Sequence, residues 1–170
     1  ENNTWAFHYF RSDTHVREEG NTDLESLKTT QGYYACGGFA ACEAATLKSA
    51  QNQLNANKNG SSKSLGGADR LRSYPGNRYQ AAHTLFYGTE LRWNFSTENT
   101  KLDYWLLQDV RQAIQAVFFW EQGSVAEEAG DIGETIRSSY GSGIRLVTKS
   151  GSVYKFEMAT GDEGAEIILF

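Results

Sequence analysis

The stretch Ile144-Arg-Leu-Val-Thr148, Lys149-Ser-Gly-Ser152, Val153-Tyr-Lys-Phe-Glu-Met158 decides the fold class of this chain. Two β-forming runs flank a short polar segment that contains glycine, which is the pattern of a β-hairpin. The tetrapeptide Gly161-Asp-Glu-Gly164 then predicts a second turn, which leads into a final strand over 165–170. Strands joined by short turns pair antiparallel, so this end of the chain predicts an antiparallel sheet.

The rest of the chain alternates between strand and helix patterns. Strands are predicted where Trp5, Phe7 and Tyr9 alternate with other residues, and again over 85–95. Helical spacing of apolar residues predicts a long helix over 39–54 and further helices over 102–121 and 125–140. With its strands mostly in hairpins, the chain is expected to be α+β, with an antiparallel sheet packed by the long helix and additional helices in 102–140.

Length and composition limit the possible classes. A chain of 170 residues, 39% hydrophobic and 13% aromatic, fits a single domain over 1–170 with a packed core. The net charge of −5 gives no electrostatic basis for non-specific binding to nucleic acid or anionic lipid. No run approaches the roughly 20 apolar residues of a membrane-spanning helix. We therefore expect no membrane partner.

The two cysteines, Cys36 and Cys42, permit one disulfide bond. In a continuous helix they would be about 9 Å apart, which is too far for a bond, so Gly37 and Gly38 must bend the chain for one to form. Two free buried thiols are the alternative. The chain begins with Glu1 rather than Met and contains three Asn-x-Ser/Thr sequons, at Asn2, Asn59 and Asn94, so a secreted, processed protein is expected.

Three ordered segments carry a resemblance to a known family. They are Tyr33-Tyr-Ala-Cys36 before a helix, Arg72-Ser-Tyr-Pro-Gly-Asn-Arg-Tyr79 after a loop, and the terminal hairpin with Arg145 and Ala159-Thr-Gly161. Their order resembles the fungal guanyl-specific ribonucleases and, more closely, the ribonuclease-like secreted effectors of powdery mildew fungi. The resemblance covers roughly residues 33–79 and 144–164.

The resemblance implies a binding protein rather than an enzyme. It places Tyr74 and Arg145 at phosphate-contact positions, with Arg78 and Tyr79 beside them as ligand-binding candidates, but Gly76 and Ala159 stand where the family has its catalytic histidines. Neither glycine nor alanine transfers a proton. The implied function is a catalytically inactive virulence effector that binds a host RNA or protein and is open to detection by a plant immune receptor.

Two other chemistries remain open. Tyr9-Phe-Arg-Ser-Asp-Thr14 resembles the first segment of ADP-ribosyltransferase toxins, which implies an NAD site formed by Arg11 with Glu163 and Glu166. Gln31 to Gly37 imitates the nucleophile segment of papain-like peptidases, with His83 as the one later histidine. The three histidines lack the spacing of a metal site, so neither a metal nor a bound cofactor is expected.

Overall fold

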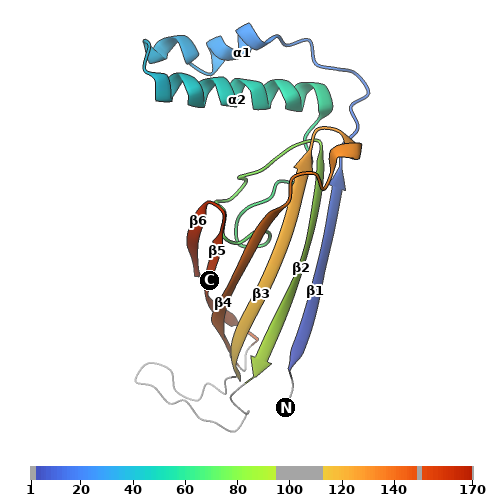
Figure 1. Ribbon diagram of the computed structural model, residues 1–170, viewed down its shortest axis with the longest axis vertical. Helices are drawn as coiled ribbons and strands as arrows, with labels where there is room; N and C mark the ends of the chain where they lie inside the picture. Colours follow the sequence, from blue (N-terminus) through green and yellow to red (C-terminus); the bar gives the residue numbers. More distant parts are fainter. Residues whose placement is uncertain (1–2, 95–112, 149–150, 170) are drawn as a thin grey trace.

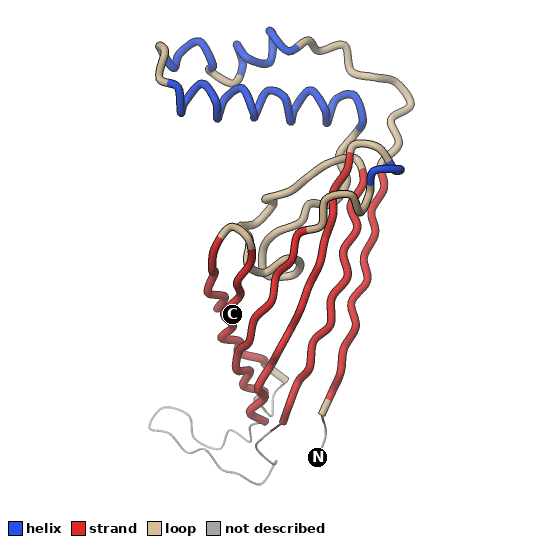
Figure 2. The backbone as a smooth tube through the Cα atoms, in the orientation of Figure 1, coloured by secondary structure: helices blue, strands red, loops and turns tan. Residues whose placement is uncertain are grey.

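The computed structural model describes residues 3–94, 113–148 and 151–169. Their fold is α+β, as the sequence predicts, and its main element is a six-stranded antiparallel sheet (Figures 1 and 2). The strands follow one another in chain order across the sheet, each paired with the next. They are β1 (Thr4–Asp13), β2 (His83–Asn94), β3 (Ala113–Ala126), β4 (Arg137–Val147), β5 (Val153–Gly161) and β6 (Gly164–Leu169).

The predicted C-terminal hairpins are confirmed. Strands β4 and β5 pair from Val147 opposite Val153 onward, and residues 149–150 of their turn lie outside the described residues. Strands β5 and β6 pair from Gly161 opposite Gly164, as the turn chemistry of this segment predicts. The opening strand and the strand over 85–95 are also present, as β1 and β2.

The helices are α1 (Leu24–Thr30), the 3₁₀ helix η1 (Tyr33–Cys36) and α2 (Ala40–Asn59). Asp23 caps α1, because its side chain accepts a hydrogen bond from the backbone N–H of Ser26. Figure 1 shows α1 and α2 side by side beyond the ends of the strands. Among the described residues no helix is long and apolar enough to cross a lipid bilayer.

The long predicted helix therefore exists, but α2 packs against α1 and η1 instead of covering the sheet. The physical reason is its composition. Only Ala50 is buried in α2, whose other residues are mostly polar or alanine. Such a helix lacks the broad apolar stripe with which helices cover sheets.

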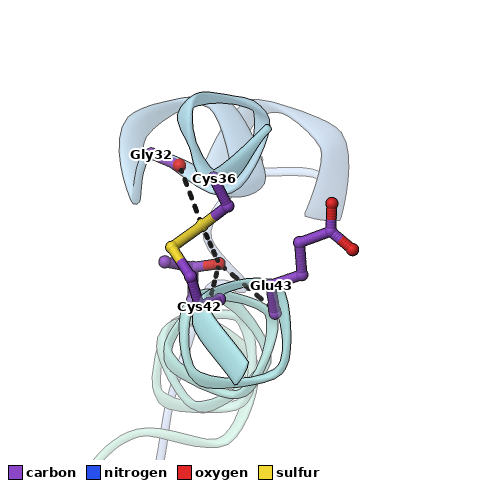
Figure 3. The surroundings of a disulfide bond; sticks show 5 residues. Gly32, Cys36, Cys42 and Glu43 are labelled. Carbon is purple, nitrogen blue, oxygen red and sulfur yellow. Dashed lines mark hydrogen bonds between the residues drawn. A yellow bond between two sulfur atoms is a disulfide. The ribbon is translucent and has the colours of Figure 1, made fainter. Parts of the chain in front are cut away.

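The predicted disulfide bond is present between Cys36 and Cys42, whose Cα atoms are 5.6 Å apart (Figure 3). Gly37 and Gly38 have φ values of +60° and +87°, in the left-handed region that glycine adopts without strain. These two residues turn the chain between η1 and α2 and bring the cysteines within bonding distance. The alternative of two free thiols is thereby excluded.

The helices predicted over 102–121 and 125–140 are wrong wherever the structure describes those residues. Residues 113–126 form β3 and residues 137–147 form β4, with only the 3₁₀ helix η2 (Ala129–Asp131) between them. Residues 102–112 lie outside the described residues. The error arose because Val117 and Phe119 are buried on one face of β3 while Phe118 and Trp120 are exposed on the other. Apolar residues on both faces conceal the two-residue period of a strand.

One face of the sheet is covered by residues 60–82, which connect α2 to β2 and which we call the strap. Its Leu65, Leu71 and Tyr74 form a buried cluster with Phe86 of β2. The strap lies so close to β3 that a Cβ at Gly123 would come within 2.6 Å of Leu65. The main apolar core of the described residues is therefore between the strap and the sheet.

Candidate functional site

Arg72, in the middle of the strap, forms ion pairs with glutamates from three strands. Its Nε donates to Glu121 of β3 at 2.7 Å, its Nη1 to Glu157 of β5 at 2.8 Å, and its Nη2 to Glu90 of β2 at 2.9 Å. The backbone N–H of Arg72 also donates to Glu121, at 2.9 Å. One guanidinium thus joins the strap to three strands of the sheet.

A second buried arginine completes the group. Arg145 of β4 donates to Glu157 at 2.8 Å and to both carboxylate oxygens of Glu90, at 2.7 and 2.8 Å. We call Arg72, Glu90, Glu121, Arg145 and Glu157 the charge cluster; each side chain is at most 7% exposed. Arg92, one-third exposed, donates to Glu90 at 2.6 Å and brings the cationic groups to three, equal to the carboxylates.

The contacts on either side of Arg72 also fix the strap. The Arg72 guanidinium carbon is 3.6 Å from the centroid of the Phe119 ring, a cation–π contact in a buried site. The N–H of Ser73 donates to the Ser139 hydroxyl at 3.0 Å, and the Tyr74 hydroxyl donates to the Ser138 carbonyl at 3.1 Å. The strap is therefore bonded to β2, β3, β4 and β5 within three consecutive residues.

This arrangement has a structural role rather than the form of a catalytic site. Every carboxylate of the charge cluster accepts charge-assisted hydrogen bonds from at least one guanidinium. Each oxygen of these carboxylates already accepts a hydrogen bond within the cluster, so none is presented to a substrate proton as a general base would be. The cluster also satisfies charges that would be very costly to bury unpaired.

The opposite face of the sheet is apolar and open. Its side chains come from all six strands, and each is between 36% and 77% exposed. We call this surface the apolar face; its residues are Trp5, Phe7, Tyr9, Leu91, Trp93, Phe118, Trp120, Tyr140, Ile144, Tyr154, Phe156, Met158, Ile167 and Leu169. The strand register also places the polar Thr89, Gln122 and Ser142 on this side of the sheet, and the charged Arg11 lies beyond Tyr9 at its end toward the helices.

The strand register arranges the apolar face in rows. A central row runs from Trp5 through Leu91 and Phe118 to Met158 and Ile167. Toward the helices the next rows hold Trp120 opposite Tyr140 and then Tyr9 opposite Tyr87, whose hydroxyl donates to Gln122. Toward the other end lie Trp93 and Tyr154. Amphipathic aromatic side chains are thus found at both ends of the face, and the central row between them contains Trp5 and Ser142 as well as Phe118 and aliphatic residues.

Near the β2 end of the strap, Arg78 and Tyr79 both hydrogen-bond Glu163 of the turn before β6. Arg78 donates to Glu163 from Nε at 2.7 Å and from Nη2 at 3.1 Å, and the Tyr79 hydroxyl donates to Glu163 at 2.6 Å. Burial, with the hydrogen bond to Glu163, raises the pKa of Tyr79 to about 12. The hydrogen bonds from Arg78 and Tyr79 lower the pKa of Glu163. All three residues line a cavity of about 360 Å³ between α2 and the strand ends.

The four ligand-binding residues predicted from the sequence do not share one accessible surface. Arg78 and Tyr79 line this cavity, and the Tyr74 and Tyr79 rings are 5.3 Å apart. Tyr74 is 1% exposed and Arg145 is 5% exposed within the charge cluster. Gly76 lies in the strap and Ala159 is buried on β5.

The residues predicted for a toxin site are separated in the sheet. Arg11 is on β1, where it bonds Asp13 at 2.8 Å, and Glu166 is on β6. These strands are the two outermost of the described six, with four strands between them. Glu163 is bonded to Arg78 and Tyr79 in the turn that precedes β6.

Within the described ranges no group of three or more histidine, cysteine, aspartate or glutamate side chains is arranged to hold a metal ion. A scan against protein-family models and searches of curated proteins and of solved structures find no match to this chain. The function must therefore be inferred from the geometry of the chain itself.

Sequence reasoning missed both the charge cluster and the apolar face. A signal for the face is present, because aromatic or aliphatic residues alternate in Trp5-x-Phe7-x-Tyr9, Phe118-x-Trp120 and Tyr154-x-Phe156-x-Met158. A signal for the cluster is weaker, since single glutamates at 90, 121 and 157 sit inside strongly apolar strands. A charge within such a strand indicates a buried partner.

Proposed function

We propose that the sheet stands in a lipid bilayer, with the apolar face against hydrocarbon and the strap-covered face toward a polar interior. The observation that carries this proposal is the exposed apolar face that crosses all six strands. Exposed apolar patches on monomeric soluble proteins rarely exceed about 300–600 Å². At roughly 4.8 Å between strands and 3.4 Å per residue, this face measures about 24 Å by 27 Å, or about 650 Å² before side-chain relief.

The lengths of five of the six strands fit the thickness of a bilayer, and β6 is shorter, with six residues. A tilted strand needs roughly 9–11 residues to cross the hydrocarbon core. Strands β1 to β5 contain 10, 12, 14, 11 and 9 residues. The apolar face extends along β3 from Ile114 to Gln122, about 27 Å at 3.4 Å per residue.

The order of side chains along the strands supports the same proposal. Tyrosine and tryptophan favour the two water–lipid boundaries, where an apolar ring carries a polar tip. Here Tyr9, Trp120 and Tyr140 are at one end, and Trp93 and Tyr154 are at the other. The strands alternate apolar residues outward with a mixed inward set, in which glutamates, serines and glycines accompany the buried Phe86, Val117 and Phe119; an apolar outward face at every second residue is the pattern of membrane-spanning strands.

Backbone chemistry sets a further condition. In hydrocarbon an unpaired N–H or C=O group costs several kcal/mol, so a sheet cannot end at a free edge there. Strands β1 and β6 each pair on one side only within the described sheet. We therefore infer that the sheet is one section of a larger closed sheet whose remaining strands pair with β1 and β6.

The strap then lies in the interior of this closed sheet, held there by the charge cluster. An interior filled by a hydrogen-bonded segment, here with the charge cluster beside the apolar cluster of the strap, is the arrangement of a plugged passage. The function we propose is accordingly the controlled passage or handling of polar cargo at a membrane, with the strap as the plug. The disulfide bond supports export into an oxidising compartment, as the sequence also predicts.

Proposed insertion departs from the expectation of no membrane partner, which rested on the absence of long apolar runs. An apolar residue at every second position reaches lipid without forming such a run. The ribonuclease-like effector with a host RNA or protein partner stays a prediction from the order of sequence segments.

Depth-dependent fluorescence quenching tests the proposal directly. Single-tryptophan variants of the full chain are reconstituted into phosphatidylcholine vesicles that carry bromine at defined acyl positions. Phe118→Trp is expected to be quenched most by deep bromines, and the native Trp120 most by shallow ones. His8→Trp is the matched control, since His8 is on β1 next to Phe7 but points to the opposite face. Quenching of His8→Trp equal to that of Phe118→Trp would contradict the proposed orientation.

A second outcome would show that the apolar face contacts protein rather than lipid. If the chain stays with the aqueous fraction when vesicles are floated and forms a defined oligomer that protects Phe118→Trp from soluble quenchers, the apolar face is a protein interface. Standard interfaces bury about 800 Å² per partner, so area alone does not exclude this result.

A further inference from the structure

A second hollow lies beside the end of β1, on the strap side of the sheet. It has a volume of about 590 Å³ and is bounded by β1, by the start of the strap and by the strap residues near Asn77. This volume is within the range of small-molecule sites, about 300–1,000 Å³. It lies beyond the Tyr9 row of the apolar face, because Ser12 and Thr14 form part of its wall.

The charges around this hollow all have one sign. Its lining contains two cations, Lys63 and Arg70, and no carboxylate. This is unusual in a chain with 21 acidic and 16 basic residues. Among the described residues neither Lys63 nor Arg70 forms an ion pair.

Arg70 is held in place without its hydrogen-bonding capacity being used. Its guanidinium carbon is 4.5 Å from the centroid of the Phe10 ring, which fixes the plane of the group. Its Nε is buried and has no hydrogen-bond partner in the described structure. A buried donor without a partner costs about 1–3 kcal/mol.

The remaining wall consists of hydroxyl and amide side chains, with no aromatic ring facing the hollow. They are Ser12, Thr14, Ser61, Ser64, Asn77 and Gln80. Such groups both donate and accept hydrogen bonds, as do the hydroxyls of a sugar or another polyol. A flat aromatic ligand would find no apolar surface on which to stack.

We propose that this hollow binds a phosphorylated sugar or polyol, with the phosphate on Lys63 and Arg70 and the hydroxyls on the serine, threonine and amide side chains. The same chemistry is found in a free sugar phosphate and in a phosphoinositol lipid headgroup. The site does not depend on the proposed membrane insertion, because a soluble ligand would reach it in either setting.

Titration calorimetry of the full chain with glucose 6-phosphate tests the site, with glucose and inorganic phosphate titrated separately. Saturable binding of glucose 6-phosphate is expected, at least about tenfold tighter than that of either fragment alone. Lys63→Gln and Arg70→Gln should each weaken binding about tenfold, which corresponds to ~1.4 kcal/mol. Lys63 is exposed, so its variant tests the site without disturbing the strap.

The matched control is Lys58→Gln, which removes the same charge from an exposed position outside the lining. An unchanged affinity of Lys58→Gln for glucose 6-phosphate supports the site. An equal loss of affinity in Lys58→Gln, Lys63→Gln and Arg70→Gln overturns it, because general charge attraction would then explain the binding. Binding of phosphate as tight as that of glucose 6-phosphate overturns the polyol part, and no binding of either overturns the proposal. Phosphatidylcholine vesicles that contain phosphatidylinositol 4-phosphate are then tested for competition with glucose 6-phosphate. Competition would identify a lipid headgroup as the ligand, and no competition would identify a free sugar phosphate.

Discussion

Arg72 and Glu121 bond each other at two points: the guanidinium Nε reaches one carboxylate oxygen at 2.7 Å, and the backbone N–H of Arg72 reaches the other at 2.9 Å. The double contact fixes both the side chain and the main chain of the strap against β3. Glu157 and Glu90 bind the remaining nitrogens of the same guanidinium, so this one side chain supplies the ionic contacts between the strap and three strands.

Replacement of Arg72 should strongly destabilise the protein. Arg72→Met leaves three buried carboxylates with fewer partners, and loss of one member of a buried ion pair costs about 3–5 kcal/mol. Arg72→Lys keeps the charge but loses the planar fork, so an intermediate loss is expected. Urea unfolding of the purified protein measures both.

Arg92→Met serves as the comparison for this experiment. Arg92 bonds only Glu90 of the cluster and is one-third exposed, so its loss should cost less than about 1 kcal/mol. A loss from Arg92→Met as large as that from Arg72→Met would show that the strap is not held by Arg72.

A charged side chain introduced on the apolar face should reduce folding stability strongly in the central row and only slightly at the rim. If the sheet stands in lipid, Phe118→Arg in the central row should cost about 2–4 kcal/mol of folding free energy in vesicles, and Tyr9→Arg at the rim about 0–1 kcal/mol. The two substitutions are compared by unfolding in the same lipid. Equal costs at both positions would argue against a graded, lipid-like surrounding.

The disulfide bond should stabilise the helical hairpin and leave the sheet unaffected. The bond closes a short loop, for which the loop-entropy relation gives about 2 kcal/mol. In Cys36→Ser with Cys42→Ser we expect faster amide hydrogen exchange in α1 and α2 and unchanged exchange in β2 and β3. The helices pack against one another and make few contacts with the sheet. A change in amide hydrogen exchange throughout the sheet would therefore contradict the expectation that the disulfide bond stabilises the helices alone.

The Tyr79 hydroxyl should titrate well above the ordinary value for tyrosine. Burial, with the hydrogen bond to Glu163, raises the pKa of Tyr79 to about 12 from the ordinary value of 10.0. In Glu163→Gln the pKa should fall but stay above 10.0, because burial is the larger cause. The difference between ultraviolet titrations of the intact chain and Tyr79→Phe isolates the residue.

The pKa of Glu163 is shifted in the opposite direction, downward. Its pKa is lowered below the ordinary 4.5 by Arg78 and Tyr79, so the contact stabilises the folded state above pH 4.5 and is lost as pH falls through the lowered pKa. Carboxyl NMR titration of Glu163 should therefore show its midpoint below 4.5. A midpoint at or above this value would mean that the contact with Arg78 is absent in solution.

Gly66 should not tolerate a side chain. Its φ is +102°, and a Cβ there would lie 2.2 Å from the Pro75 carbonyl oxygen within the strap. Gly66→Ala is expected to cost at least about 1–3 kcal/mol through strain and overlap. Gly130→Ala, where a Cβ would meet nothing within 4 Å, should be nearly neutral in the same thermal unfolding assay.

Local sequence determined those features that depend on near neighbours. The hairpin from β4 to β5 follows from its turn residues, and the bond from Cys36 to Cys42 follows from two glycines that accept a left-handed backbone. The long helix α2 also follows from helix-forming residues. In each case the decisive interactions join residues only a few positions apart, so their energies can be read from the order of the residues.

Only the tertiary structure decided which side of each strand would be buried. Val117 and Phe118 are both apolar, and nothing near them in the sequence states that the first lies under the strap and the second is open. The charge cluster depends in the same way on the sheet register, because Arg72 and Glu157 are 85 residues apart. The sequence alone thus determined turns, one helix and the disulfide bond, whereas the apolar face and the bonded strap arise from strand pairing between distant residues, which sets the facing of every side chain at once.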